Sequence, residues 1–133
     1  MAGYSGTPLA AKLGIREGSR LYVSGAPRAY STLVAPLPKD VTTAGLTVRT
    51  DVIHIFSTKK ADLARMLMSV MKKMRPDAAI WVSWPKKSSG VPSDITEDTV
   101  RAVALPMGLV DVKVCAVDDT WSGLKLVIRK DRR

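Results

Sequence analysis

Apolar and polar residues alternate with two different periods along this chain, and the changes of period mark its elements. Residues 52–57 and 78–84 are apolar on both faces of an extended chain, which is typical of central strands covered on both sides. Between them, apolar side chains recur at intervals of three and four residues, which predicts one amphipathic helix. Strand, helix and strand in this length predict a right-handed βαβ unit. The apolar positions of the helix are Leu63, Met66, Leu67, Val70, Met71 and Met74.

The last third of the chain predicts a helix and a hairpin. Thr96 is the expected N-cap of the helix, and Ile95 and Val100 flank it as a hydrophobic staple. Strands are expected at residues 110–117 and 124–129. The alternation in the second of them predicts an antiparallel strand near one edge of the sheet.

The first 50 residues carry weaker signals, because glycine and proline interrupt them. We expect a short helix over residues 7–13, a strand over 20–24 and a helical turn within 28–34. A second strand is expected near 46–48. All these elements together predict an α/β fold, a three-layer Rossmann-like sandwich whose sheet is mainly parallel. Residues 1–133 contain no linker or internal repeat, so a single domain is expected.

Composition narrows the classes of protein. The hydrophobic fraction of 46% argues against a disordered chain. No apolar run approaches the ~18 residues of a membrane span, and the opening MAGYSGTPLAAK lacks the apolar centre of a signal peptide. These features predict a cytoplasmic protein of bacterial type that does not enter a membrane. The net charge of +9 favours an anionic binding partner, which could be a small molecule, an acidic protein or nucleic acid.

The chain has one cysteine and one histidine, Cys115 and His54. These counts exclude a disulfide within the chain and a cysteine-based zinc site, so no metal site is predicted. His54 stands in an apolar strand and is expected to be buried and hydrogen-bonded. Cys115 is expected to be an inert thiol within a strand.

Four polar loops follow predicted strands, at residues 25–27, 57–60, 84–90 and 118–123. Because ligands of such sheets bind at the carboxyl ends of the strands, we expect these loops to meet there. Cations, hydroxyls and a flexible backbone in one loop suit a phosphate or a carboxylate. Paired carboxylates suit magnesium or acid–base chemistry, and an indole can stack on a ligand ring. The candidate ligand-binding residues are therefore Lys86, Lys87, Ser88, Ser89, Asp118, Asp119 and Trp121.

Each of these candidates also has a structural interpretation. Lys86 and Lys87 could be solvated, or could pair with Asp118 or Asp119 and so join the two loops. The sequence Asp-Asp-Thr is also common in ordinary turns. Trp121 could cover the end of the core instead of contacting a ligand.

Three long segments carry a family resemblance: WPKKSSGVPSD at 84–94, ITEDTVRAVALPMGLVD at 95–111 and KVCAVDDTWSGLKLVIRK at 113–130. They resemble the bacterial domain-of-unknown-function family numbered 3052. The opening GYSGTPLAAKLGI at 3–15 resembles the start of that family too. The resemblance implies kinship over nearly the whole chain, and it implies no activity.

The order of elements resembles, more loosely, the methyltransferase variant of the Rossmann fold. In that family a glycine loop follows the first strand, and the last two strands form a hairpin after a helix. Here the loop at 25–27 has a single glycine, Gly25. Residues 48–50 bring no acid to bind ribose hydroxyls unless Asp51 reaches. We therefore expect the fold without the cofactor, and poor binding of adenosylmethionine.

These observations favour a small binding module that holds an anionic ligand or partner at the carboxyl edge of its sheet. One alternative is a methyltransferase-like or phosphate-ester-acting enzyme that uses Asp118, Asp119 and Lys87. The other is an accessory protein that binds nucleic acid non-specifically through its charge. No nucleophile is paired with a base, so the sequence assigns no catalytic residue and favours a protein that is not an enzyme.

Overall fold

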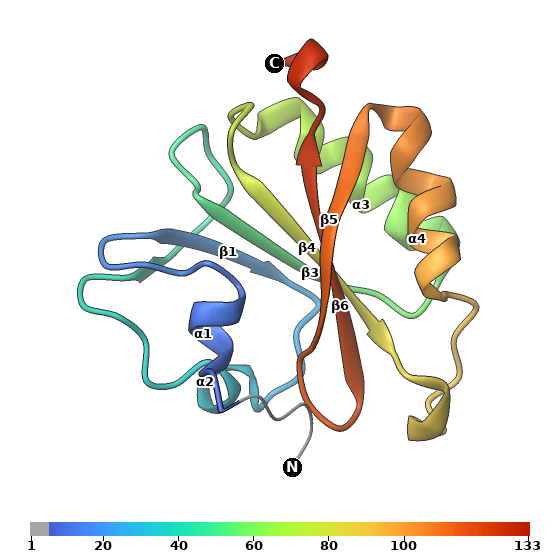
Figure 1. The fold of residues 1–133 in the computed structure, drawn as a ribbon, viewed down its shortest axis with the longest axis horizontal. Helices are drawn as coiled ribbons and strands as arrows, with labels where there is room; N and C mark the ends of the chain where they lie inside the picture. Colours follow the sequence, from blue (N-terminus) through green and yellow to red (C-terminus); the bar gives the residue numbers. More distant parts are fainter. Residues whose placement is uncertain (1–5) are drawn as a thin grey trace.

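The computed structural model of the protein describes residues 6–133. Residues 3–5 of the segment that resembles the family's opening lie outside the described residues, as does the start of the segment compared with a signal peptide. Six strands form one mixed sheet in the order β2-β1-β3-β4-β6-β5 (Figure 1). The strands are β1 (Arg20–Ser24), β2 (Thr42–Thr43), β3 (Val52–Phe56), β4 (Ala79–Pro85), β5 (Leu109–Ala116) and β6 (Trp121–Ile128). The α-helices are α1 (Leu9–Lys12), α2 (Tyr30–Leu33), α3 (Lys60–Lys73) and α4 (Glu97–Ala104), and the 3-10 helices are η1 (Lys87–Ser89), η2 (Leu105–Met107) and η3 (Lys130–Arg132).

The pairing of the strands confirms the predicted fold class. Strands β2, β1, β3 and β4 are parallel, and β6 runs antiparallel between β4 and the edge strand β5. The chain winds from β1 outward to β2, then returns to β3 and winds the other way to β4. Right-handed crossovers in opposite directions lie on opposite faces of a sheet. Accordingly, α1 and α2 cover one face, and α3 and α4 cover the other (Figure 1).

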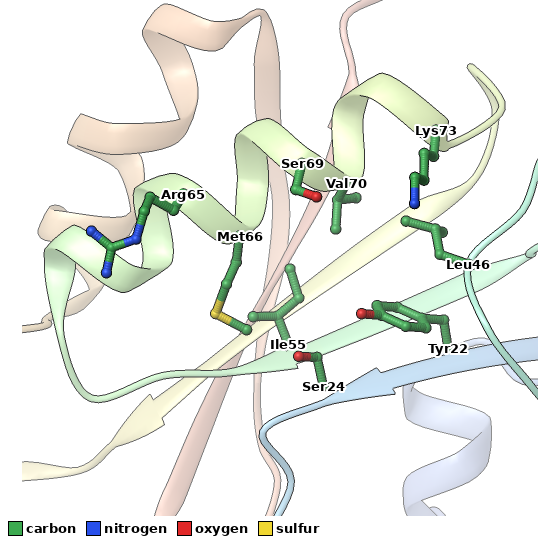
Figure 2. A pocket seen from close by; sticks show the side chains of 9 residues that line it. All are labelled: Tyr22, Ser24, Leu46, Ile55, Arg65, Met66, Ser69, Val70 and Lys73. Carbon is green, nitrogen blue, oxygen red and sulfur yellow. The ribbon is translucent and has the colours of Figure 1, made fainter.

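One half of the α3 face carries no helix. Helix α3 lies over β3 and β4, but the connection between β2 and β3, residues 44–51, is too short and irregular to cover β1. A groove is left between α3 and β1, lined from both sides as Figure 2 shows.

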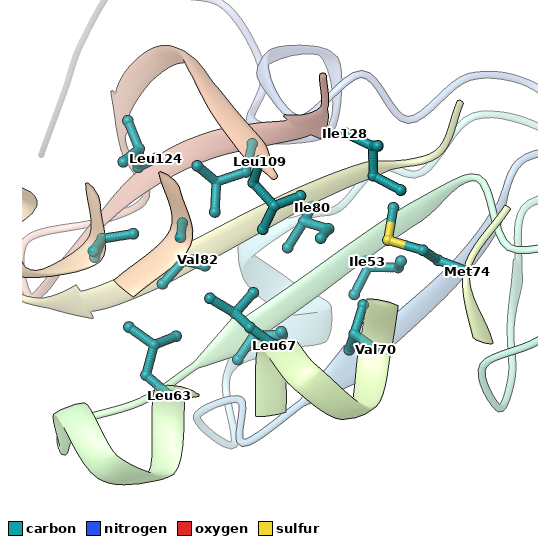
Figure 3. Close-up of a cluster of buried hydrophobic side chains, with 14 of the residues drawn as sticks. Ile53, Leu63, Leu67, Val70, Met74, Ile80, Val82, Leu109, Leu124 and Ile128 are labelled. Atoms are coloured by element: carbon teal, nitrogen blue, oxygen red, sulfur yellow. The ribbon is translucent and has the colours of Figure 1, made fainter. Parts of the chain in front are cut away.

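The predicted stripe of α3 forms the larger core (Figure 3). Leu63, Leu67 and Val70 are buried against the sheet, where they meet strand residues such as Ile53 and Ile80. A smaller core fills the opposite face. At its centre Trp81 is fully buried, and its indole Nε1 donates a hydrogen bond to the carbonyl of Leu13 over 2.9 Å. No helix among residues 6–133 combines the length and apolarity that a membrane crossing requires.

The position predicted for the second strand, near residues 46–48, is wrong. The strand lies at Thr42–Thr43, where the backbone N–H groups of Thr42 and Ala44 donate to carbonyls beside and within β1. Thr47, in the middle of the segment predicted to be a strand, begins a turn instead. The backbone N–H of Thr47 donates to the hydroxyl of Thr50, and that of Thr50 donates to the carbonyl of Thr47. This local bonding competes successfully with pairing along the sheet.

Other boundaries move by a few residues. Helix α1 begins at Leu9 with Pro8 as its N-cap, one residue later than the expected start at Pro8 with Thr7 as the cap. Trp121, assigned above to the loop at 118–123, is the first residue of β6 and pairs with Pro85. The turn is tighter than expected, because the backbone N–H of Val117 donates directly to the carbonyl of Trp121.

The start of α4 agrees with its prediction. The hydroxyl of Thr96 accepts a hydrogen bond from the backbone N–H of Thr99 over 3.2 Å, and Ile95 and Val100 are both buried. This cap satisfies one of the N–H groups that the first turn of a helix leaves without a partner.

Replacing Thr96 by alanine is expected to lower the free energy of unfolding by about 1 kcal/mol, because the cap is lost and nothing replaces it. Urea denaturation of the purified variant measures the change. Thr96→Ser is the matched control, since it keeps the hydroxyl and should remain near the parent. A serine variant as unstable as the alanine variant would show that the methyl group, and not the cap, carries the effect.

Candidate functional site

The loop after β4 and the loop before β6 lie against each other, because β6 pairs antiparallel with β4 and Trp121 stands opposite Pro85. The ammonium of Lys86 donates to the backbone carbonyl of Asp118 over 2.7 Å, and the backbone N–H of Lys86 donates to the carbonyl of Thr120 over 2.8 Å. The contact of Lys86 is with a carbonyl and not with a carboxylate. The side chain of Lys86 is therefore engaged in joining the two loops.

Much of the hydrogen-bonding capacity in these loops is used internally. The carboxylate of Asp118 accepts from the backbone N–H groups of Thr120 and Trp121 over 2.8 and 2.7 Å, which closes the turn. The hydroxyl of Ser89 donates to the carbonyl of Lys86 over 2.6 Å. Lys87, Ser88 and Asp119 are exposed. Of the seven candidates, Trp121 alone is among the residues that line the cavities described here.

The cavity that Trp121 lines, which we name the switch pocket, lies at the carboxyl ends of β1 and β3. The winding of the sheet reverses between these strands, and ligands of open α/β sheets bind at such a reversal. The cavity has a volume of about 450 Å³. Its lining residues are Ser24, Gly25, Phe56, Ser57, Thr58, Asp62, Arg65, Met66 and Trp121.

Gly25 is required by the backbone itself. Its φ angle is +72°, and a Cβ atom added there would lie 2.6 Å from the carbonyl oxygen of Phe56. No real Cβ tolerates that distance, so the chain can turn here with glycine alone. The single glycine after the first strand is therefore explained by the packing of two strands, without any ligand.

A row of rings supports one wall of the switch pocket. The ring of Trp121 meets Phe56 edge-on at 5.1 Å between centroids, and Phe56 stacks on His54 at 4.3 Å. Tyr30 of α2 meets both Phe56 and His54 edge-on. Aromatic pairs at such distances attract each other. The ring of Phe56 at the pocket is therefore supported by Tyr30, which lies on the α1 and α2 face of the sheet.

His54 is buried and hydrogen-bonded, as expected from its strand. Its Nδ1 lies 2.8 Å from the hydroxyl of Tyr30, and its Nε2 lies 2.7 Å from the hydroxyl of Ser83. Burial lowers the pKa of His54 to about 3 and raises the pKa of Tyr30. Both ring nitrogens of His54 are thus engaged, and the ring is neutral at ordinary pH. This chain of three side chains ties α2, β3 and β4 together below the pocket.

The charges at the switch pocket come from α3. Arg65 forms an ion pair with Asp62 one turn before it on the exposed side of the helix. The N-terminus of α3 is already occupied, because the backbone N–H of Lys60 donates to the carboxylate of Asp94 over 2.7 Å. The hydroxyl of Ser57 accepts from the backbone N–H of Lys59. Arg65 is therefore the cation that the pocket offers to a ligand.

Asp51 does not reach this edge of the sheet. Its carboxylate accepts from the backbone N–H of Arg20 over 2.7 Å and from the guanidinium of Arg75 over 2.6 Å, at the amino ends of the parallel strands. Burial opposes the ionisation of Asp51, but these two partners together lower its pKa. Among residues 6–133 there is also no group of three histidine, cysteine or acidic residues that could hold a metal ion.

The family described as "Protein of unknown function (DUF3052)" matches residues 38–130. The chain belongs to this family. No curated protein matches the DUF3052 chain by sequence.

Solved structures place the fold of this DUF3052 protein among methyltransferases. A SAM dependent methyltransferase from Aquifex aeolicus has a TM-score of 0.64 and 16% identity, covering 91% of this chain and 88% of its own. A candidate type 11 methyltransferase from Sulfolobus solfataricus has a TM-score of 0.66 and 12% identity, covering 98% and 95%. The precorrin-6y C5,15-methyltransferase from Geobacter metallireducens GS-15 has a TM-score of 0.59 and 12% identity, covering 91% and 86%. At these identities the likeness concerns the fold, and the predicted resemblance to the Rossmann-like methyltransferase fold is confirmed.

Sequence reasoning missed five residues that line the switch pocket: Ser24, Phe56, Asp62, Arg65 and Met66. Met66 was assigned to the core stripe of the helix. The signal that could have found them is the strand order, because residues that follow the two strands at the reversal must share one edge.

Proposed function

We propose that this DUF3052 protein is a binding module for a small anion that carries a flat apolar group, held in the switch pocket. The observation that carries the proposal is the position of that pocket at the reversal of the sheet, together with Trp121 and Arg65 among its lining residues. Its volume of about 450 Å³ falls in the usual range of small-molecule sites.

The chemistry of the lining supports an amphipathic ligand. Phe56, Met66 and Trp121 offer an apolar wall on which a planar ring can stack. Arg65 lines the pocket and can offer several N–H donors to a phosphate or carboxylate. The net charge of +9 raises the concentration of anions near the surface.

The test uses the fluorescence of Trp121. Trp81 and Trp84 are 0% and 5% exposed, whereas Trp121 is half-buried, so a ligand in the switch pocket should change the emission of Trp121. Adenosine monophosphate is the probe, and adenosine is its uncharged counterpart. We expect adenosine monophosphate to change the emission with a saturable curve and to bind more tightly than adenosine. The variant Trp121→Phe should abolish the signal.

Arg65→Ala should weaken the binding of adenosine monophosphate about tenfold, the strength of one charge-assisted hydrogen bond. Lys72→Ala is the matched control, since it removes one cation from the same helix outside the pocket, and it should change the affinity less than twofold. Asp62→Asn should tighten binding, because it removes a like charge. Equal losses in Arg65→Ala and Lys72→Ala would mean that attraction is diffuse, and the proposal would fail.

A second candidate, a methyltransferase-like enzyme, is favoured by the fold of the solved relatives. Two observations oppose it. Gly25 faces Phe56 at close range, and no acid follows β2, where Ala44 and Gly45 stand. Dinucleotide sites of related folds use an acid there to bind ribose. Adenosylmethionine is therefore expected not to change the emission of Trp121. Saturable binding of adenosylmethionine in calorimetry, without binding of adenosine monophosphate, would favour this candidate.

A further inference from the structure

A second hollow, which we name the sheet-face groove, runs along α3 over the uncovered half of the sheet (Figure 2). It has a volume of about 390 Å³. The groove shares Ser24, Arg65 and Met66 with the switch pocket and extends from there toward the end of α3. Its other lining residues are Tyr22, Leu46, Ile55, Ser69, Val70 and Lys73.

The floor of the groove is apolar. Ile55 and Val70 belong to the larger core, and Tyr22, Leu46 and Met66 pack against that core while remaining half-exposed. In Figure 2 the ring of Tyr22 and the side chain of Leu46 lie on the sheet side, opposite the helix. These side chains would gain stabilisation if an apolar group covered them, at roughly 25 cal/mol for each Å² removed from water.

The helical rim of the groove is basic. Arg65, Ser69 and Lys73 are spaced four residues apart, so they stand one above another on the same side of α3. Eight residues of helix place the two cations at about 12 Å from each other along the axis. None of the nine lining residues is acidic. Among the ion pairs of residues 6–133, none includes Lys73.

The groove follows from the topology of the sheet. Helix α3 belongs to the crossover that leads away from β1, and the β1–β2 crossover lies on the other face. The connection that returns to β3 contributes Leu46 and a tight turn instead of a helix. The strand order therefore leaves β1 uncovered on the α3 face, and the sheet-face groove is a consequence of the topology.

We propose that the sheet-face groove is a second binding site, distinct in its occupant from the switch pocket, for an amphipathic anion with an acyl-like chain. The chain lies on Tyr22, Leu46 and Met66, and the anionic group lies at Lys73. Charge complementarity supports this occupant, because the rim offers cations and no carboxylate. The two sites share Ser24, Arg65 and Met66, but Lys73 lines only the groove and Trp121 lines only the switch pocket, so variants at these two residues test the sites separately.

The probe is octyl phosphate, with octanol as its uncharged counterpart. The readout is the NMR signal of the methionine methyl groups in protein labelled at those methyls. Octyl phosphate is expected to shift the Met66 signal saturably, whereas the signal of Met107, in η2 outside the groove, should not move. Octanol should bind at least several-fold more weakly. A Met66 signal that octyl phosphate leaves unmoved would overturn the proposal.

Paired variants separate the groove from general attraction. Lys73→Gln should weaken octyl phosphate about fivefold to tenfold, whereas Lys72→Gln, its exposed neighbour, should change the affinity less than twofold. Ser69→Tyr should close the groove and abolish binding, whereas Met68→Tyr, at a position 54% exposed and outside the lining, should not.

Vesicles of phosphatidylglycerol distinguish a free anion from a membrane surface. Binding of monomeric octyl phosphate at concentrations where it forms no micelles supports the proposal. Binding to the vesicles without binding to monomeric octyl phosphate overturns it, as do equal losses in the two lysine variants. The change of Trp121 emission with adenosine monophosphate tests the switch pocket alone. If adenosine monophosphate leaves the emission unchanged, the proposed function fails, and the binding of octyl phosphate in the groove is still expected.

Discussion

The variant Gly25→Ala is expected to lower the free energy of unfolding by about 2 to 5 kcal/mol. The left-handed backbone at φ +72° costs an L-residue roughly 1 to 2 kcal/mol. The new methyl group would also lie 2.6 Å from the carbonyl oxygen of Phe56, so the two strands must separate, and such overpacking typically costs about 1 to 3 kcal/mol. Urea denaturation measures the sum. Because Phe56 lines the switch pocket, the same variant should also weaken the binding of adenosine monophosphate.

Two other glycines separate the causes. Gly14 has a φ of +78° with open space around its Cβ position, so Gly14→Ala should show the backbone cost alone, about 1 to 2 kcal/mol. Gly45 has open space and no positive φ, so Gly45→Ala should be neutral or stabilising by about 0.5 kcal/mol. Equal destabilisation in Gly25→Ala and Gly14→Ala would contradict the close contact with Phe56.

Acidification is expected to destabilise the protein through His54. In the folded protein the pKa of His54 is about 3, against an ordinary value of 6.5. Below pH 6.5 the histidine is therefore protonated in the unfolded chain and remains neutral in the folded protein. Stability is therefore complete above pH 6.5 and is lost as the pH falls toward 3. The loss is about 1.4 kcal/mol per pH unit, or about 2 kcal/mol between pH 6.5 and 5.

The window from pH 7 to 5 isolates this histidine. The carboxyls of Asp51 and Asp111 have pKa values below their ordinary 3.8, so they titrate at lower pH. The chain has one histidine, so its ring signals in NMR are unambiguous. The ring should not titrate in the folded protein between pH 7 and 5. A free energy of unfolding that stays constant over this window would refute the account of the buried chain from Tyr30 to Ser83.

The sequence predicted the central elements well because each is buried in a regular pattern. Strand β3 is apolar on both faces, and the stripe of α3 repeats over four turns. Strand β2 was misplaced because two residues carry no periodicity, and its pairing is decided by backbone groups beside β1. Local hydrogen bonds between Thr47 and Thr50 removed the competing segment from the sheet.

Of the candidate site, the sequence predicted that two loops lie close together, and it did not predict how their side chains are bonded. The antiparallel pairing of β6 with β4 brings the loops of Lys86 and Asp118 together at the edge of the sheet where they were expected. The hydrogen-bond partners could not be predicted, because a backbone carbonyl and two backbone N–H groups take the places that side chains were expected to fill. The sheet-face groove has no sequence signal, since it results from a helix that the connection between β2 and β3 does not form.

The place of β6 in the sheet has a consequence for how the protein is made. In the sheet of residues 6–133, β5 pairs with β6 alone, and β6 also provides the second neighbour of β4. While a ribosome is still synthesising residues 121–128, β5 has no strand to join and the apolar edge of β4 is open. The parallel part of the sheet can form first, but the hairpin must then insert its last strand as one step. Until residues 121–128 have left the ribosome, the edge of β4 therefore stays unpaired, and the nascent chain is prone to aggregate through it.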